Sequence, residues 1–161
     1  MDALLRHKGT PYQLSYITQS NHQRQNFTKL ASILTPIVHI DLSSVLGSAF
    51  DFPNQPAEDY VAMISAPNRL GNPFVATQHL LGASTWARTA ERNITATYQV
   101  RAQNIRFADN GSGGRSNVQL RAAVTYATVD HHFFNGDDGW KLAGLKAVTL
   151  FNDGNATAVF N

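Results

Sequence analysis

The amino-acid sequence predicts one α+β domain in which helices gather on one face of an antiparallel sheet. The first half of the chain has helical patterning, whereas the second half holds four extended apolar segments separated by turn signals. Helices that precede a run of strands are typical of α+β domains and not of alternating βαβ units. A chain of 161 residues with 43% hydrophobic residues suits a single domain, which we assign to residues 1–161.

The first two helices are predicted from capping residues and prolines. Thr10 caps a helix that starts at Pro11, because proline is favoured at the first helical position. Asn26 caps a second helix, which is expected to end at Pro36. Polar residues 20–25 separate the two, so we expect a helix–loop–helix. Their apolar positions are Leu14, Ile17, Phe27, Leu30, Ile33 and Leu34.

A short strand, a loop and a third helix complete the first half. Residues 37–42 can form the strand, and residues 47–56 are expected as a loop. Pro56 lies near the start of the third helix, where two acidic residues in the first turn complement the helix dipole. Pro67 marks its end. The buried face of this helix is expected to comprise Tyr60, Met63 and Ile64.

Long strands joined as antiparallel hairpins are predicted for the second half. Glycine-containing turns at residues 110–114 and 135–139 separate several of them. The four strands are expected at residues 75–87, 94–107, 118–134 and 140–151.

Apolar side chains occupy both faces of the strand at residues 118–134, although one face of an antiparallel sheet usually meets water. Both faces of the sheet therefore need cover. The helices can cover one face, and a second copy of the protein is the simplest cover for the other, so we expect a homo-oligomer. The alternative is a long apolar loop or tail folded over the sheet.

Composition and charge exclude several classes of function. The formal charge of +2 comes from basic and acidic residues spread along the chain, so we expect no nucleic-acid partner. The absence of cysteine excludes disulfides and cysteine-based zinc sites and favours a cytoplasmic location. Residues 1–10 hold too short an apolar run for a signal peptide or a membrane span. His131 and His132 are neighbours on a strand and face opposite sides, which makes them a poor metal pair. One of them could instead lie at an oligomer contact.

Several segments resemble the scytalone dehydratases, which belong to the NTF2-like, or SnoaL-like, superfamily. The similarity is strongest at Thr77-Gln78-His79 within residues 60–79, and in the Gly-Trp-Lys-Leu-Ala-Gly-Leu segment at residues 139–145. Leu80 to Gly82, Trp86 and the pair Ile40-Asp41 also fit. The resemblance implies a cystatin-like cone, with a curved antiparallel sheet that encloses N-terminal helices and an internal pocket. It also implies a homotrimer. The sequence holds no metal-ligand cluster and no nucleotide-binding fingerprint, so we expect a reaction without metal or organic cofactor.

The resemblance implies that His79 is an acid/base group beside an acidic C–H of the substrate. An imidazole suits this task because its ordinary pKa lies near neutrality. The alternative is a buried histidine with a structural hydrogen bond. Asn104 stands where the family has a second histidine, on the strand face of Tyr98, Val100 and Ala102 that should line the pocket. Its amide could orient a carbonyl or polarise an enolate oxygen, or it could be a structural polar group near the strand end.

Other positions depart from the family pattern and make the expected pocket more apolar. His22 and Leu42 align with two tyrosines of the family, and Gln23 aligns with an aspartate. Ala127 and Val129 align near a serine and an asparagine. His22 could restore one acid/base group, or it could be a solvated loop residue. The residues expected to contact substrate are Leu42, Met63, Leu70, Val100, Ala102, Ala127, Val129 and Leu145.

The favoured hypothesis is a cofactor-free lyase, isomerase or cyclase of secondary metabolism, acting on a polyketide- or terpenoid-like small molecule. Dehydration, isomerisation and ring closure, including a pericyclic reaction, stay open. The competing hypothesis is a small-molecule binding protein of the same fold without turnover, because a fold alone does not determine function.

Overall fold

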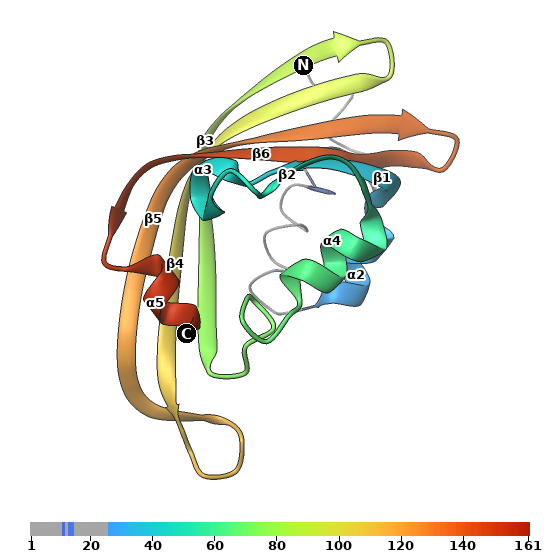
Figure 1. Ribbon diagram of the computed structural model, residues 1–161. Helices are drawn as coiled ribbons and strands as arrows, with labels where there is room; N and C mark the ends of the chain where they lie inside the picture. Colours follow the sequence, from blue (N-terminus) through green and yellow to red (C-terminus); the bar gives the residue numbers. More distant parts are fainter. Residues whose placement is uncertain (1–10, 12, 15–25) are drawn as a thin grey trace.

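A computed structural model describes residues 11, 13, 14 and 26–161. It confirms the predicted fold class: a strongly curved sheet holds the helices on its concave side (Figure 1). The elements are α2 (Phe27–Ser32), β1 (Leu34–Asp41), α3 (Ser43–Leu46), β2 (Asp51–Pro56), α4 (Ala57–Ile64), β3 (Val75–Ala90), β4 (Asn93–Asp109), β5 (Arg115–Gly136), β6 (Gly139–Asp153) and α5 (Ala156–Phe160).

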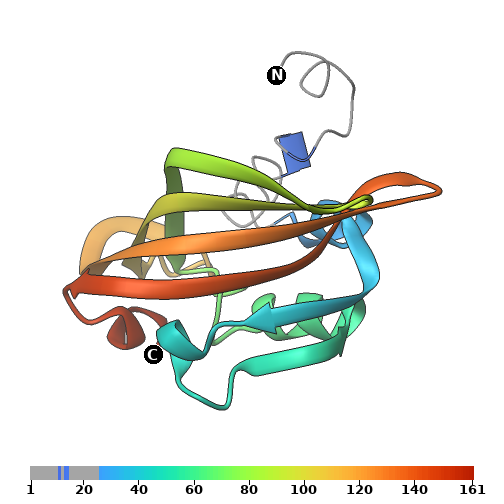
Figure 2. The same cartoon turned by 90° about the horizontal axis from the view of Figure 1, so that it is seen from above.

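The described residues form a sheet of six strands in the order β2-β1-β6-β5-β4-β3. All neighbouring pairs are antiparallel except β1 and β6, which run parallel. The four long strands follow one another as hairpins, as predicted, and each exceeds its predicted range by a few residues. Seen from above, the long strands form one continuous layer, with α4 beneath it (Figure 2).

The N-terminal segments agree only partly with the sequence-based prediction. Pro11, Gln13 and Leu14 are helical, whereas Ile17 and the loop with His22 lie outside the described residues. The Asn26 cap is present, because its Oδ1 accepts a hydrogen bond from the backbone N–H of Lys29 at 3.0 Å. The helix ends at Ser32 instead of Pro36, and β1 begins at Leu34.

Other elements of the structure also differ from the prediction. The expected loop at residues 47–56 contains an edge strand, β2, and a short helix, α3, precedes it. The third predicted helix corresponds to α4, which ends at Ile64 and not at Pro67. Helix α5 was not predicted at all. Within the described part of the chain, no helix is both long and apolar enough to cross a bilayer.

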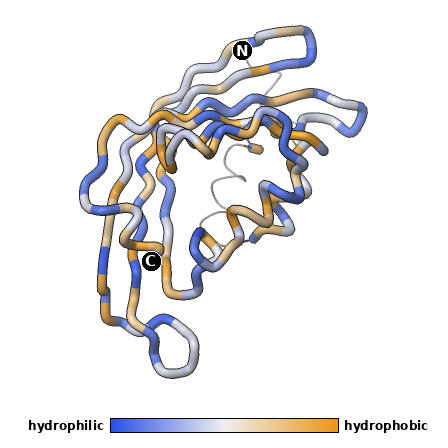
Figure 3. The backbone as a smooth tube through the Cα atoms, in the orientation of Figure 1, coloured by the Kyte–Doolittle hydropathy of each residue, from blue (hydrophilic) through white to orange (hydrophobic). Residues whose placement is uncertain are grey.

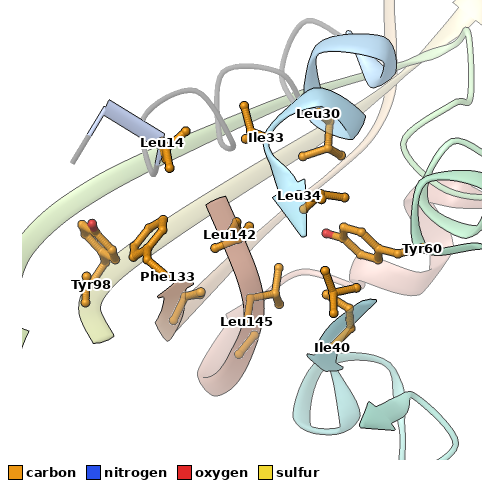
Figure 4. Packing of buried hydrophobic residues seen from close by; sticks show 14 of the residues in the cluster. Leu14, Leu30, Ile33, Leu34, Ile40, Tyr60, Tyr98, Phe133, Leu142 and Leu145 are labelled. Carbon is orange, nitrogen blue, oxygen red and sulfur yellow. The ribbon is translucent and has the colours of Figure 1, made fainter. Parts of the chain in front are cut away.

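The main hydrophobic core fills the concave side of the bend, between the sheet and helices α2 and α4. Tyr60 of α4 is 1% exposed and lies between Leu34 and Ile40 of β1 (Figure 4). Tyr98 and Phe133 contribute from the long strands. This core holds α4 against the sheet and leaves the space beside it for a cavity.

The convex face of the sheet also carries apolar side chains. Hydropathy changes repeatedly along the long strands (Figure 3), and in β5 the odd-numbered residues from 123 to 133 are buried, whereas their even-numbered neighbours are not. Val148 and Phe151 pair with the even-numbered Thr128 and Tyr126 of β5 and are exposed, and these two apolar residues form the convex patch. Val118, Leu120 and Leu150 are exposed apolar residues of the same two strands. Both strand faces are therefore apolar, as the sequence predicts.

Candidate functional site

A cavity of about 240 Å³ lies inside the bend. The concave faces of β3 to β6 form its wall, and α3, α4, the segment at residues 65–74 and α5 close it from the other side. All residues expected to contact substrate line it: Leu42, Met63, Leu70, Val100, Ala102, Ala127, Val129 and Leu145. His79 and Asn104 line it too. His22 lies outside the described residues, so its role stays a prediction.

His79 projects from β3 into the cavity wall. It pairs with Ala102 of β4, which faces the same cavity. Burial lowers the pKa of His79 to about 4, because a low-dielectric environment disfavours the imidazolium. The imidazole is therefore neutral at physiological pH and can accept a proton from a bound molecule.

Asn104 lies next to His79, in register with Thr77 two residues before it. Its side chain is 7% exposed, and its Oδ1 is buried without a hydrogen-bond partner among the described residues. Leaving a buried amide oxygen unsatisfied costs free energy. A buried polar atom without a partner in the fold is a candidate for contact with a ligand.

His131 also lines the cavity, which the sequence analysis missed. It pairs with Ala96 and Leu145 on its two neighbouring strands and is 0% exposed. Burial, together with the charge of His132, lowers the pKa of His131 to about 4. Its even-numbered neighbour His132 is on the opposite face, where Nδ1 lies 3.1 Å from Thr95 Oγ1. The odd-numbered series shared with Ala127 and Val129 was the signal that could have placed His131 in the cavity.

Arg69 and Thr125 are further polar residues of the cavity that the sequence did not single out, and Tyr60, which was expected on the buried face of its helix, lines the cavity too. Thr125 Oγ1 donates a hydrogen bond to Asn152 Oδ1 at 2.8 Å. Burial raises the pKa of Tyr60, so its phenol stays protonated. Helix α5 contributes Ala156, Thr157 and Phe160, followed by Asn161.

Asp41, which fits the family pattern, has a structural role at the start of α3. Its Oδ1 accepts hydrogen bonds from the backbone N–H and the hydroxyl of Ser43, and Oδ2 pairs with Lys146 Nζ at 3.2 Å. The hydrogen bonds from Ser43 lower the pKa of Asp41. Within the ranges that the structure describes, no three His, Cys, Asp or Glu side chains gather as a metal site.

Comparison with known families finds one match that covers almost the whole chain. The model of the family described as scytalone dehydratase matches residues 13–161. A dehydratase from Pestalotiopsis microspora is 37% identical over 137 residues, which cover 84% of this chain and 82% of that protein. A scytalone dehydratase from Aspergillus fumigatus is 33% identical, over 87% of this chain and 80% of that one.

Solved structures share the fold at lower sequence identity. A protein from Kribbella flavida superposes with a TM-score of 0.72 at 21% identity, over 92% of this chain and 93% of that one. A hexachlorocyclohexane dehydrochlorinase superposes with a TM-score of 0.62 at 13% identity, over 89% and 84% of the two chains. A Streptomyces avermitilis protein described as a dehydratase of the NTF2-like family superposes with a TM-score of 0.63 at 14% identity, over 87% of this chain and 94% of that one.

Proposed function

This chain belongs to the scytalone dehydratase family, and from that premise we propose that it is a cofactor-free lyase that removes water from a small apolar molecule in the internal cavity. The observation that carries the proposal is the position of His79, a neutral imidazole on the wall of a mostly apolar cavity. The relatives named dehydratase, at 33–37% identity, support the lyase class. We also propose that the substrate is a polyketide- or terpenoid-like product of secondary metabolism.

The proposed reaction is a β-elimination in which His79 carries the proton. The imidazole takes a proton from the carbon beside a carbonyl group, and the electrons of that C–H bond form the new C=C bond. The C–O bond to the β-hydroxyl breaks, and the leaving hydroxide takes the proton back from the imidazolium to give water. Substrate therefore becomes alkene and water, and His79 returns to its neutral form. The low pKa of His79 favours this return, because its imidazolium is a strong acid.

Asn104 is proposed to stabilise the enolate that develops during proton removal. The amide lies two residue pairs along the sheet from His79 and lines the same cavity. An amide donor fixed in a dry site stabilises a developing oxyanion without having to reorganise. His79 is level with Ala102 of β4 and Thr125 of β5 in the sheet. His131 lies six residues further along β5 than Thr125, so we assign it no proton transfer in this step.

The test is turnover by matched histidine variants. Purified protein is incubated with a panel of apolar β-hydroxy ketones and β-hydroxy acids, and mass spectrometry detects products that have lost one water. We expect His79→Gln to lose this activity, while His132→Gln, altered on the opposite face of the sheet, retains it. Substrate affinity should survive in His79→Gln. If His79→Gln matches the unaltered protein, the acid/base assignment is wrong. If panel members bind and are never converted, the non-catalytic carrier is the better reading.

A further inference from the structure

Arg69 introduces a positive charge into an otherwise mostly apolar cavity. It lies in the segment between α4 and β3, beside Leu70, and both residues line the cavity. Among the described residues that line the cavity there is no Asp or Glu, and the two histidines, His79 and His131, are held neutral by their lowered pKa values. Arg69 is therefore the one charged side chain of the cavity wall within the part of the chain that the structure describes.

The backbone around Arg69 is fixed by short-range hydrogen bonds. Its N–H donates to the carbonyl of Ala66 at 2.9 Å, and its own carbonyl accepts from the N–H of Asn72 at 3.1 Å. Gly71 packs so closely that a Cβ there would lie 1.8 Å from the carbonyl oxygen of Ser65. The segment thus presents Arg69 to the cavity from a compact turn.

The guanidinium has an aromatic neighbour and forms no ion pair with an acidic side chain of the described residues. Its Cζ lies 5.1 Å from the ring centroid of Phe50, a cation–π arrangement. None of the ion pairs between described residues includes Arg69; they join His39 to Asp51, Arg92 to Asp137 and Lys146 to Asp41. A cation over an aromatic ring retains its N–H groups as donors, and these donors match a carboxylate in pairs.

We propose that Arg69 binds a carboxylate of the substrate, so that the molecules which enter this cavity are apolar monocarboxylic acids. This inference rests on the proposed function, and it names the substrate class of the same site. A carboxylate fits better than a phosphate, because a phosphate needs several donors and this wall supplies one guanidinium among largely apolar side chains. The apolar remainder of the acid would fill the space between Met63, Val100 and Leu145, and its reacting carbon would face His79.

The test compares a pair of probes of the same shape that differ in charge. Isothermal titration calorimetry at neutral pH measures the dissociation constants of 2-naphthoate and of its neutral analogue 2-naphthamide. We expect the unaltered protein to bind naphthoate about 10-fold more tightly than naphthamide, since a hydrogen bond to a charged group is worth roughly that factor. Arg69→Gln should lose this preference while its affinity for naphthamide stays unchanged. Arg69→Lys should keep part of it.

The control variant is Arg101→Gln, which removes the same charge from an exposed residue of β4, beside the cavity residue Val100. It should retain the full preference for naphthoate. The proposal is overturned if the unaltered protein shows no preference, binds neither probe, or if the preference survives in Arg69→Gln. These outcomes are independent of turnover. A preference for naphthoate that requires Arg69, in a protein that never dehydrates a β-hydroxy acid, would refute the lyase and leave the acid-binding site in place.

Discussion

Replacing Asn104 by leucine should stabilise the protein and impair the reaction. Asn104 is 7% exposed, and its Oδ1 has no hydrogen-bond partner among the described residues. Leaving a buried polar group unsatisfied costs about 1–3 kcal/mol, and leucine removes that cost while adding buried apolar surface. Overpacking takes back part of the gain, although the adjacent cavity gives the larger side chain room. We expect the free energy of unfolding to rise by about 1 kcal/mol.

The matched control is Asn72→Leu, at an asparagine that is equally buried, with 6% exposure. Asn72 Oδ1 accepts a hydrogen bond from the backbone N–H of Phe74 at 2.9 Å. Leucine removes this acceptor and leaves the N–H of Phe74 without it, so the variant should lose about 1–2 kcal/mol. The same chemical change therefore has opposite effects on stability at the two positions.

Urea unfolding at one fixed protein concentration measures both variants, because the stability of an oligomer depends on concentration. For a chain of this length, 1 kcal/mol corresponds to a Tm shift of about 2–4 °C. With any substrate found in the dehydration panel, Asn104→Leu should lower kcat about 100-fold, the usual cost of losing one oxyanion donor. An Asn104→Leu protein that is less stable than the unaltered one would show that the amide supports the fold, and the argument would fail.

Three further predictions concern the cavity segment, the histidines and the convex face. Gly71→Ala should lower Tm markedly, since its Cβ would collide with a backbone oxygen, whereas Gly136→Ala, which meets only a side chain at 3.5 Å, should leave Tm unchanged. His79 and His131, with pKa values of about 4, bind fewer protons folded than unfolded below pH of about 6.5. Stability should therefore fall between pH of about 6.5 and 4, and His131→Phe should make this loss shallower; equal slopes would contradict the assignment. Sedimentation should give a homotrimer of the 17.6 kDa chain, and Val148→Asp on the convex patch should dissociate it; a monomeric unaltered protein would refute the burial argument.

The long strands were predictable because their signals are local. Extended segments with apolar residues on one or both faces, bounded by glycine-containing turns, indicate β3 to β6 without knowledge of distant contacts. The edge strand β2 escaped prediction because prolines occupy it, and proline is tolerated in a strand where one side lacks a partner. Pro36 misled the prediction in a similar way. It lies in β1 between Leu34 and His39, where the pairing with β6 is irregular.

The candidate site was predictable only where a motif marked it. His79 and Asn104 were found through the resemblance at residues 77–79 and through the face of a strand, and both line the cavity. Arg69 carried no such signal, because an arginine in a segment between a helix and a strand usually faces solvent. Its place in the cavity follows from the packing of residues 65–74 and from the ring of Phe50. These are tertiary contacts, which the local sequence does not reveal.

The charges of the cavity connect the two proposals. With the cavity empty, burial disfavours protonation of His79. A bound carboxylate places a negative charge in the same cavity, and in a low-dielectric site the effect of such a charge reaches further than in water. The proton affinity of His79 therefore rises when an acid is bound. A neutral ligand of the same shape would leave His79 a weaker base, so Arg69 would select substrates both by affinity and by the basicity that their binding confers.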